Sequence, residues 1–479
     1  MTLTDQFVST ACLCYDDPHF DHRSFHAKAF TMLQQNPWLA HADIWCAATA
    51  GNLAAVTGFL RQDEHLVSKP GPNGWSPLLC ACYSRVQPLD PSHSTFQVAG
   101  LLLDRGADPN TFTMKGNCDQ RLDQTPHRYT ALTGLFGGGP CGMANHPSHP
   151  RWRDLADLLL TRGADPADQQ ALRITQDRET TYGKLEILLR HGLPPAAMGH
   201  PLSSAVLAGD VRSVRLLLAH QAPTGEPFRG KLPWRHAMDR GHLDIARMLE
   251  QAGAPVTQLD ELEHFISMCM AGIKIDCTPE LLSRAPRQLV LMASGTGRRE
   301  AVELALDLGF DPNYLDEVTA LHASAASGKE NAAGGNQQGI MRLLLSRGGS
   351  LTIREPFYDG TPVGWADFFD QRSMRDMLLD EGDICLFDAL DFNRLDRIPD
   401  ILQRDPAALN RPFAQCLSRE PQPEDWQTPL QRMEKQGNAE AIRILFASLK
   451  DAADTLLTRP PTPPIFNPKE HCRILSPAS

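Results

Sequence analysis

The sequence contains no long hydrophobic run. No apolar stretch approaches the roughly 20 residues that a membrane-spanning helix needs. Residues 1–10 include Asp5 and lack a basic region followed by an apolar core. We therefore expect neither a membrane span nor a secretory signal, and we expect a cytoplasmic location.

Positive charge is scarce relative to negative charge. The chain has 46 Lys and Arg against 57 Asp and Glu, a net charge of −11. Proteins that bind nucleic acid normally present a basic face to the phosphates. This balance argues against a nucleic-acid partner and favours a protein with a basic face, mainly through the rate of association.

The sequence also lacks a disulfide framework and the signatures of common enzymes. Its 12 cysteines have no regular spacing, and 479 residues far exceed a disulfide-stapled module. There is no His-Glu-x-x-His, no Gly-x-Ser-x-Gly and no kinase signature set. Residues 295–300 begin like a dinucleotide-binding loop but lack its third glycine. We expect free thiols, no catalysis, no cofactor and no bound metal.

One amphipathic helical segment recurs along the chain. Leucine, isoleucine and methionine at helical spacing form a single apolar stripe. A glycine then permits the left-handed residue that ends a helix, and in several copies a proline prevents its continuation. The copies are Phe96–Asn110, Trp152–Pro166, Tyr182–Pro195, Val211–Pro223, His242–Val256, Arg299–Asn313, Gln338–Leu351 and Ser373–Asp383.

A shorter helical segment precedes several of these copies. It usually begins with a Thr or Ser N-cap, often followed by proline at the first helical position. A short glycine turn joins the two helices, and the turn glycines Gly209 and Gly241 are 32 residues apart. The short segments are Ser76–Ser84, Thr130–Phe136, Leu232–Met238, Thr319–Ala325, Thr361–Asp367 and Thr428–Glu434.

Thr-Pro-Leu, helix, glycine turn, Leu-rich helix and Gly-Ala-Asp-Pro, repeating at about 33 residues, resemble the ankyrin repeat. The chain is similar to bacterial-type ankyrin-repeat proteins. The resemblance implies an all-α solenoid of about eleven helix pairs with short hairpin loops. It also implies a non-catalytic scaffold that binds another protein on its concave face. We expect an N-terminal helical cap at 1–41, the repeats at 42–450 and a proline-rich, disordered tail at 451–479.

Four insertions interrupt the array, at 84–95, 111–128, 137–150 and 327–338. The first and third fall between the two helices of neighbouring pairs, so stacking would place them side by side. Long loops in a tight repeat are often functional.

Two alternative hypotheses stay open. In one, the insertions at 84–150 form a small-ligand or divergent enzymatic site near His127, Cys141 and His146, although their spacing matches no closed zinc pattern. In the other, residues 459–479 engage a proline-reading domain.

The predicted partner surface consists of large amphipathic side chains on the first helices and hairpins, because such residues dominate interface energetics. For each of them the competing interpretation is packing between repeats. The sequence leaves the oligomeric state open. The candidates are Trp75, Tyr83, Arg85, Tyr129, Trp234, Arg235, His322 and Trp365.

Overall fold

A computed structural model describes residues 2–15, 22–71, 74–116, 125–138, 146–173, 178–327 and 337–458. This part of the chain is mostly helical with few strands, consistent with the expected all-α class. Backbone contacts divide the chain into two units. Unit 1 comprises Met1–Ser350 and Pro362–Asp376, and unit 2 comprises Leu351–Thr361 and Met377–Ser479.

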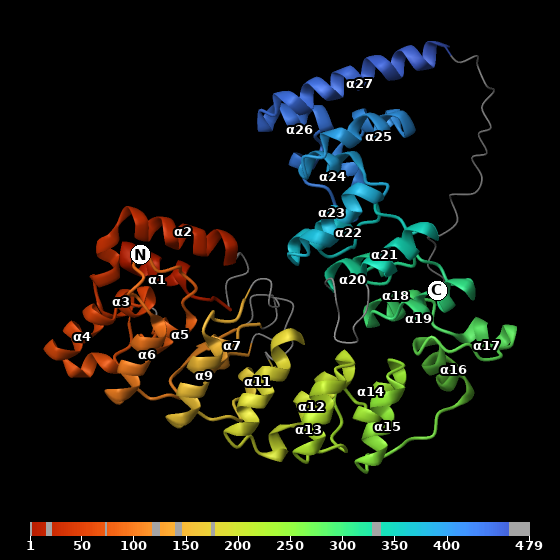
Figure 1. Ribbon diagram of the computed structural model, residues 1–479. Helices are drawn as coiled ribbons and strands as arrows, with labels where there is room; N and C mark the ends of the chain where they lie inside the picture. The colour runs from red at the N-terminus through yellow and green to blue at the C-terminus, as the bar shows by residue number, and fades with distance from the viewer. Residues whose placement is uncertain are drawn as a thin grey trace, which may run out of the picture. The chain divides into compact units, whose positions relative to one another are not determined.

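Unit 1 starts with α1 (Leu3–Ala11), α2 (His22–Gln35) and the 3-10 helix η1 (Pro37–His41). Figure 1 shows the helices that follow, coloured from red through green to cyan along the unit. They are α3 (Ile44–Ala50), α4 (Leu53–Gln62), η2 (Glu64–Val67), α5 (Pro77–Tyr83), α6 (Thr95–Asp104), α7 (Ala131–Phe136), α9 (Trp152–Thr161), α10 (Gln169–Arg173), α11 (Arg178–Arg190), η3 (Pro195–Ala197), α12 (Gly199–Ala208), α13 (Val211–Ala219), α14 (Pro233–Asp239), α15 (Leu243–Gln251), α16 (Glu261–Met270), α17 (Pro279–Arg284), α18 (Leu289–Thr296), α19 (Arg299–Asp307), α20 (Ala320–Ala326), α21 (Gln337–Ser346) and α22 (Pro362–Phe368).

Helix α23 (Arg372–Glu381) begins in unit 1 and ends in unit 2. The other helices of unit 2 are α24 (Leu386–Asp391), η4 (Leu395–Arg397), α25 (Ile398–Arg404), η5 (Pro406–Asn410), η6 (Phe413–Cys416), η7 (Pro423–Asp425), α26 (Pro429–Gln436) and α27 (Ala439–Thr458). None of the helices in the described ranges combines the length and apolar character needed to cross a membrane.

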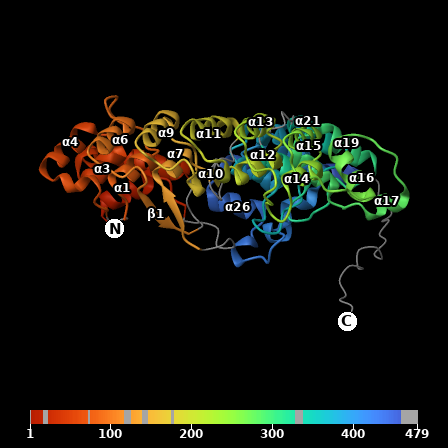
Figure 2. The same cartoon turned by 90° about the horizontal axis from the view of Figure 1, so that it is seen from below.

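Consecutive helices of unit 1 pack in pairs, such as α3 with α4, α5 with α6, α12 with α13 and α14 with α15. The first helix of a pair also contacts the first helix of the next pair, as α3 does α5 and α12 does α14. Second helices do the same, as α4 contacts α6 and α13 contacts α15. Figure 2 shows these outer helices side by side in unit 1.

The local sequence explains these helices. In α5, the Ser76 hydroxyl accepts a hydrogen bond from the Leu79 N–H, and every residue of the helix is buried. In α6, Val98 and Leu102 are fully buried on one stripe. Gly106 then takes a φ of 89°, a left-handed conformation that other residues adopt only at a cost. A short apolar helix and a longer amphipathic one therefore follow directly from residue spacing.

A strand pair lies in the insertion at 111–128, where the sequence analysis expected no strands. Strand β1 (Phe112–Lys115) and strand β2 (His127–Thr130) are antiparallel, with Phe112 opposite Thr130 and Met114 opposite Arg128. Threonine and aromatic residues, which favour extended backbone, are frequent here. The all-α expectation thus holds for most of the described chain but not for this hairpin.

The two ends of the chain were expected to differ from the repeats. Helices α1, α2 and η1 lie within the expected cap at 1–41, and α1 packs on α3. After α1 the chain pairs with the segment following α5, since the Leu13 N–H donates to the Tyr83 carbonyl at 3.1 Å. At the other end α27 continues to Thr458, beyond the expected boundary at 450, and residues 459–479 lie outside the described residues.

Candidate functional site

Most of the residues predicted to contact a partner are inside the protein. Five of the eight are buried, with exposed fractions from 0% to 8%, so the expectation of an exposed surface is wrong for them. The first helices are short and rich in small residues, and large rings from neighbouring pairs fill the space between them. These five are Trp75, Tyr83, Tyr129, Trp234 and His322.

The first three of these belong to one aromatic cluster near the N-terminal segment. The Tyr15 ring stacks on Tyr129 with ring centroids 4.7 Å apart and meets Tyr83 edge-on at 6.3 Å. Trp75 lies 4.8 Å from Tyr83. The Tyr83 hydroxyl donates to the Thr130 carbonyl at 2.9 Å, which ties α5 to the start of α7. The cluster therefore joins residues that are far apart in the sequence, and it is packing rather than a binding surface.

Arg85 is mostly enclosed and donates only to backbone carbonyls. Its Nε donates to Pro147 at 2.9 Å and its Nη2 to Gly134 at 2.6 Å. Its Nη1 donates to Cys82 and Ser84 at 3.1 and 3.0 Å. Burial lowers the pKa of Arg85 to about 10, so the guanidinium remains charged at neutral pH. Arg85 thus fastens α5, α7 and the insertion at 137–150 together.

The insertions at 84–95 and 137–150 do lie side by side, as the stacking argument predicted. Besides the bond from Arg85 to Pro147, the hydroxyl of Thr95 lies 3.0 Å from Nε2 of His149. This prediction is confirmed for the described parts of both insertions.

The two histidines of the insertion at 137–150, His146 and His149, are structural. The His146 ring stacks on Tyr15 at 4.4 Å, and its Nε2 donates to the Cys14 carbonyl at 2.6 Å. Burial lowers the pKa of His146 to about 4, and burial also lowers the pKa of His149. Both rings are therefore neutral at pH 7 and packed.

No group of three metal-ligating side chains occurs within the described residues. Cys141, which the small-ligand hypothesis named, lies outside them.

The remaining candidates lie further along unit 1. The Trp234 indole N–H donates to Glu250 at 2.7 Å, and Arg235 donates to both Asp239 and Glu263 at 2.7 Å. The Arg235 side chain is 19% exposed, so it is only partly accessible to a partner.

His322 and Trp365 also hold the stack together. The Nδ1 atom of His322 lies 2.8 Å from the Thr319 hydroxyl at the start of α20, and its ring meets the half-buried Trp365 ring at 5.5 Å. Each of these two side chains has a packing role that accounts for its position.

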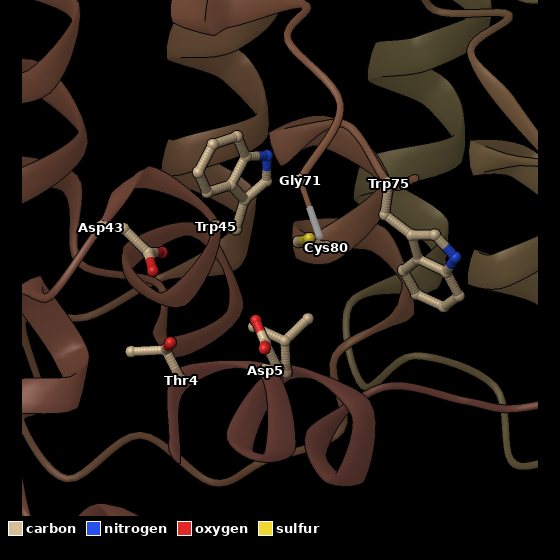
Figure 3. A pocket seen from close by; sticks show the side chains of 8 residues that line it. Thr4, Asp5, Asp43, Trp45, Gly71, Trp75 and Cys80 are labelled. Atoms are coloured by element: carbon tan, nitrogen blue, oxygen red, sulfur yellow. The ribbon is translucent and has the colours of Figure 1, made fainter. Parts of the chain in front are cut away.

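A small pocket lies between α1, α3 and α5, lined by Thr4, Asp5, Val8, Asp43, Trp45, Gly71, Trp75 and Cys80. Figure 3 shows Trp45 and Trp75 on either side of Gly71 and Cys80. A Cβ at Gly71 would lie 2.9 Å from the Trp45 ring, which explains the glycine. The hollow has a volume of about 10 Å³, room for roughly one water molecule. It is too small to hold a substrate.

A second cavity, of about 190 Å³, lies near the end of α1 and is lined by Val8, Ser9, Cys12, Leu13, Cys14, Trp75 and Lys115. It does not include His127 or His146, which the small-ligand hypothesis placed in its pocket. Burial raises the pKa of Cys12 to about 12, so this thiol stays protonated and is a poor nucleophile. The cavity offers no evident chemistry.

The β1–β2 hairpin exposes the side chains that the sequence analysis missed. Phe112 and Met114 are 46% and 52% exposed and lie on the same face of the strand. The Arg128 guanidinium lies 4.3 Å from the centroid of the Phe112 ring and donates to the Asn110 carbonyl at 3.0 Å. We call Phe112, Met114 and Arg128 the hairpin face. The alternation Phe112-Thr113-Met114 within an insertion was the available signal.

The base of the hairpin is firmly anchored. Tyr129 and Thr130 at the end of β2 are buried, and Tyr129 belongs to the aromatic cluster. Asn110, just before β1, donates to the Gly163 carbonyl at 2.9 Å and accepts from the Asp165 N–H at 2.8 Å. The hairpin face is therefore an exposed apolar surface on a fixed support. No family model matches the chain, and no curated protein was found that is similar to it.

Proposed function

We propose that this chain is an ankyrin-type stack of helix pairs that acts as a non-catalytic, cytoplasmic scaffold and binds another protein through the hairpin face. The stack is supported by contacts that run mainly between neighbouring helix pairs, the pattern of a repeat array. Such arrays use their extended surfaces for binding.

A repeated asparagine contact also supports the ankyrin-type interpretation. Asn110 bridges to Gly163 and Asp165 of the next pair, as described above. Asn313 makes the same bridge further along, donating to the Gly348 carbonyl at 2.8 Å and accepting from the Ser350 N–H at 2.7 Å. The two asparagines thus occupy corresponding positions in their helix pairs and make the same two hydrogen bonds, as expected of a structural repeat.

The observation that carries the binding proposal is the exposure of Phe112 and Met114 on an anchored hairpin. Exposed apolar side chains on a rigid support lose little conformational entropy on binding. Because each is already about half buried, burying the rest of it would contribute about 0.8–1.5 kcal/mol. The adjacent Arg128 adds a donor that would favour a carboxylate or carbonyl on the partner.

The test is affinity capture of the tagged chain from its native extract, with mass spectrometry. The variant is Phe112→Thr with Met114→Thr, because threonine keeps the strand propensity. We expect a partner whose affinity falls at least about 10-fold in this variant, because the two lost apolar contacts together contribute about 1.6–3 kcal/mol.

The matched control is Val256→Thr with Ile273→Thr, two side chains of unit 1 that are 55% and 44% exposed. It should bind like the unmodified chain. Equal binding by both double variants, or no specific partner at all, would contradict the proposal. Far-UV circular dichroism would confirm that both variants fold.

A further inference from the structure

The β1–β2 hairpin leaves one edge of a two-stranded sheet unpaired. In an antiparallel pair, opposite residues alternate between pairs that exchange two backbone hydrogen bonds and pairs that exchange none. The Ala131 N–H donates to the Thr111 carbonyl at 3.2 Å, and these two residues continue the register of the hairpin by one position. Counting from this bonded pair, Phe112 and Met114 fall in the pairs that exchange no hydrogen bond.

The backbone groups of Phe112 and Met114 therefore point away from β2. An independent contact agrees with this direction, because Thr130 lies opposite Phe112 and its carbonyl points away from β1 to accept from the Tyr83 hydroxyl at 2.9 Å. Phe112 and Met114 thus each present one N–H and one carbonyl on the outer side of β1. Within the described ranges these four groups have no hydrogen-bond partner. We call them the β1 edge.

The β1 edge lies on the outer side of the hairpin. Strand β2 packs against α7 and α10, whereas β1 packs mainly against β2. Figure 2 shows the hairpin at the margin of unit 1. Its base is fixed by Asn110 and by the stacking of Tyr129 on Tyr15. An unpaired strand edge on a fixed support is a template for pairing with another extended chain.

We propose that the partner of the hairpin face adds an extended segment to the β1 edge as a third strand. This inference rests on the proposed function and names the kind of partner. A strand added there places alternate side chains beside Phe112 and Met114, which lie on one face and are 46% and 52% exposed. Main-chain hydrogen bonds give the affinity, and the alternate side chains give the specificity. The partner segment therefore carries apolar residues at alternate positions.

The charge of the hairpin selects an acidic segment. Residues 112–115 and 127–130 include Lys115 and Arg128 and no Asp or Glu. The Arg128 guanidinium lies 4.3 Å from the centroid of the Phe112 ring, and an added strand would lie about 4.8 Å from β1, so an acidic side chain could reach it. Two copies of this chain paired through their β1 edges would instead bring like charges together, which is destabilising. The occupant is therefore an acidic segment of another protein.

The experiment titrates the full-length chain with a labelled eight-residue peptide of alternating valine and glutamate, followed by fluorescence anisotropy. Two matched peptides carry N-methyl groups, one on every valine and the other on every glutamate. The N–H groups of successive residues point to opposite edges of an extended chain, so only one methylated peptide is blocked on the edge that faces β1. We expect that peptide to bind at least about 10-fold more weakly, because hydrogen bonds are lost, and the other to bind like the unmodified peptide.

Substitutions of Met114 test the same hydrogen bonds from the side of the chain. Met114→Pro removes one outward N–H and no bond between β1 and β2, and proline is tolerated on an edge strand. Met114→Thr removes the same side chain and keeps the N–H. We expect the unmodified peptide to bind Met114→Pro about 5-fold more weakly than Met114→Thr. Equal unfolding midpoints of the two variants would confirm that both keep the hairpin.

Two results would overturn the proposal. The first is an unmodified peptide that does not bind up to about 1 mM, or methylated peptides that bind equally, because pairing through the main chain tolerates many sequences. The second is self-association of the chain that Met114→Pro abolishes, since a second copy would then occupy the edge. The proposed function is judged separately, by capture from the native extract. A partner lost in Phe112→Thr with Met114→Thr, together with failed peptide pairing, would remove the third strand and leave binding by the hairpin face.

Discussion

The buried Arg85 offers the sharpest test of how unit 1 is held together. Its guanidinium makes four hydrogen bonds to carbonyls of Cys82, Ser84, Gly134 and Pro147. Hydrogen bonds to a charged group contribute about 1.5–3 kcal/mol each. The replacement Arg85→Ala removes all four hydrogen bonds.

The expected loss is smaller than the sum of these bonds because the cation is buried. Burial lowers the pKa of Arg85 from 12.5 to about 10, and each pKa unit corresponds to about 1.4 kcal/mol of cost to the charged form. This desolvation cost of about 3.5 kcal/mol offsets about half of the lower sum, about 6 kcal/mol, of the four hydrogen bonds. We expect Arg85→Ala to destabilise the region by about 3 kcal/mol.

The effect should be local, because the contacts of unit 1 run mainly between neighbouring helix pairs. Hydrogen exchange by mass spectrometry would follow peptides from α5, from α7 and from residues 146–150. A loss of 3 kcal/mol predicts roughly 100-fold faster exchange where opening limits it. Arg190→Ala is the control, because Arg190 pairs with Asp157 at the surface, where it is 60% exposed.

Exchange that rises less than about twofold in Arg85→Ala, equal to the control, would refute this reasoning. Such a result would mean that the aromatic cluster alone fixes the insertions. Arg85→Lys should fall between the two, because one ammonium cannot reach four carbonyls in a fork geometry.

Two other substitutions address the same region. In Gly134→Ala the new Cβ would lie 2.1 Å from the Tyr83 ring. We therefore expect the free energy of unfolding to fall by about 2 kcal/mol or more. Displacement of the Tyr83 ring should reduce the near-ultraviolet circular dichroism. Unchanged spectra would contradict it. His146 has a folded-state pKa of about 4, below its ordinary 6.5. Protonation therefore favours the unfolded chain, and stability is lost as pH falls from 6.5 to 4, by up to about 3 kcal/mol. His146→Phe keeps the stacking on Tyr15 and should weaken this acid sensitivity, which is checked by measuring unfolding at pH 7 and 4.5. An unchanged pH dependence in this variant would contradict the prediction.

Residue spacing alone was enough to predict much of the fold. The leucine stripes of α6, α9, α13 and α15 and the glycines that end them are local features, and the helices occur where those features predicted them. Local periodicity decides which face of a helix is apolar, so it can be read without a structure. The two strands of the hairpin were not predicted, because four residues are too few to show a clear alternation of apolar and polar side chains.

The candidate residues for binding could not be predicted in the same way. A tryptophan or tyrosine can serve equally in a core or at an interface, and its residue type does not distinguish the two. Trp75 and Tyr83 are core residues because they pack against each other and because Tyr15, distant in the sequence, packs against Tyr83. Phe112 and Met114 remain 46% and 52% exposed on the hairpin, and residue type alone does not indicate this either.

The sequence by itself determined that the chain forms successive short and long helices, with glycines at their ends and insertions between them. Those properties depend on residues three or four positions apart. Only the tertiary structure decided that Arg85 is a buried clamp, that His146 is a packed ring and that the backbone groups of Phe112 and Met114 point away from β2. The physical reason is that the burial of a side chain depends on residues of other helix pairs. The sequence of one helix pair does not specify which residues those are.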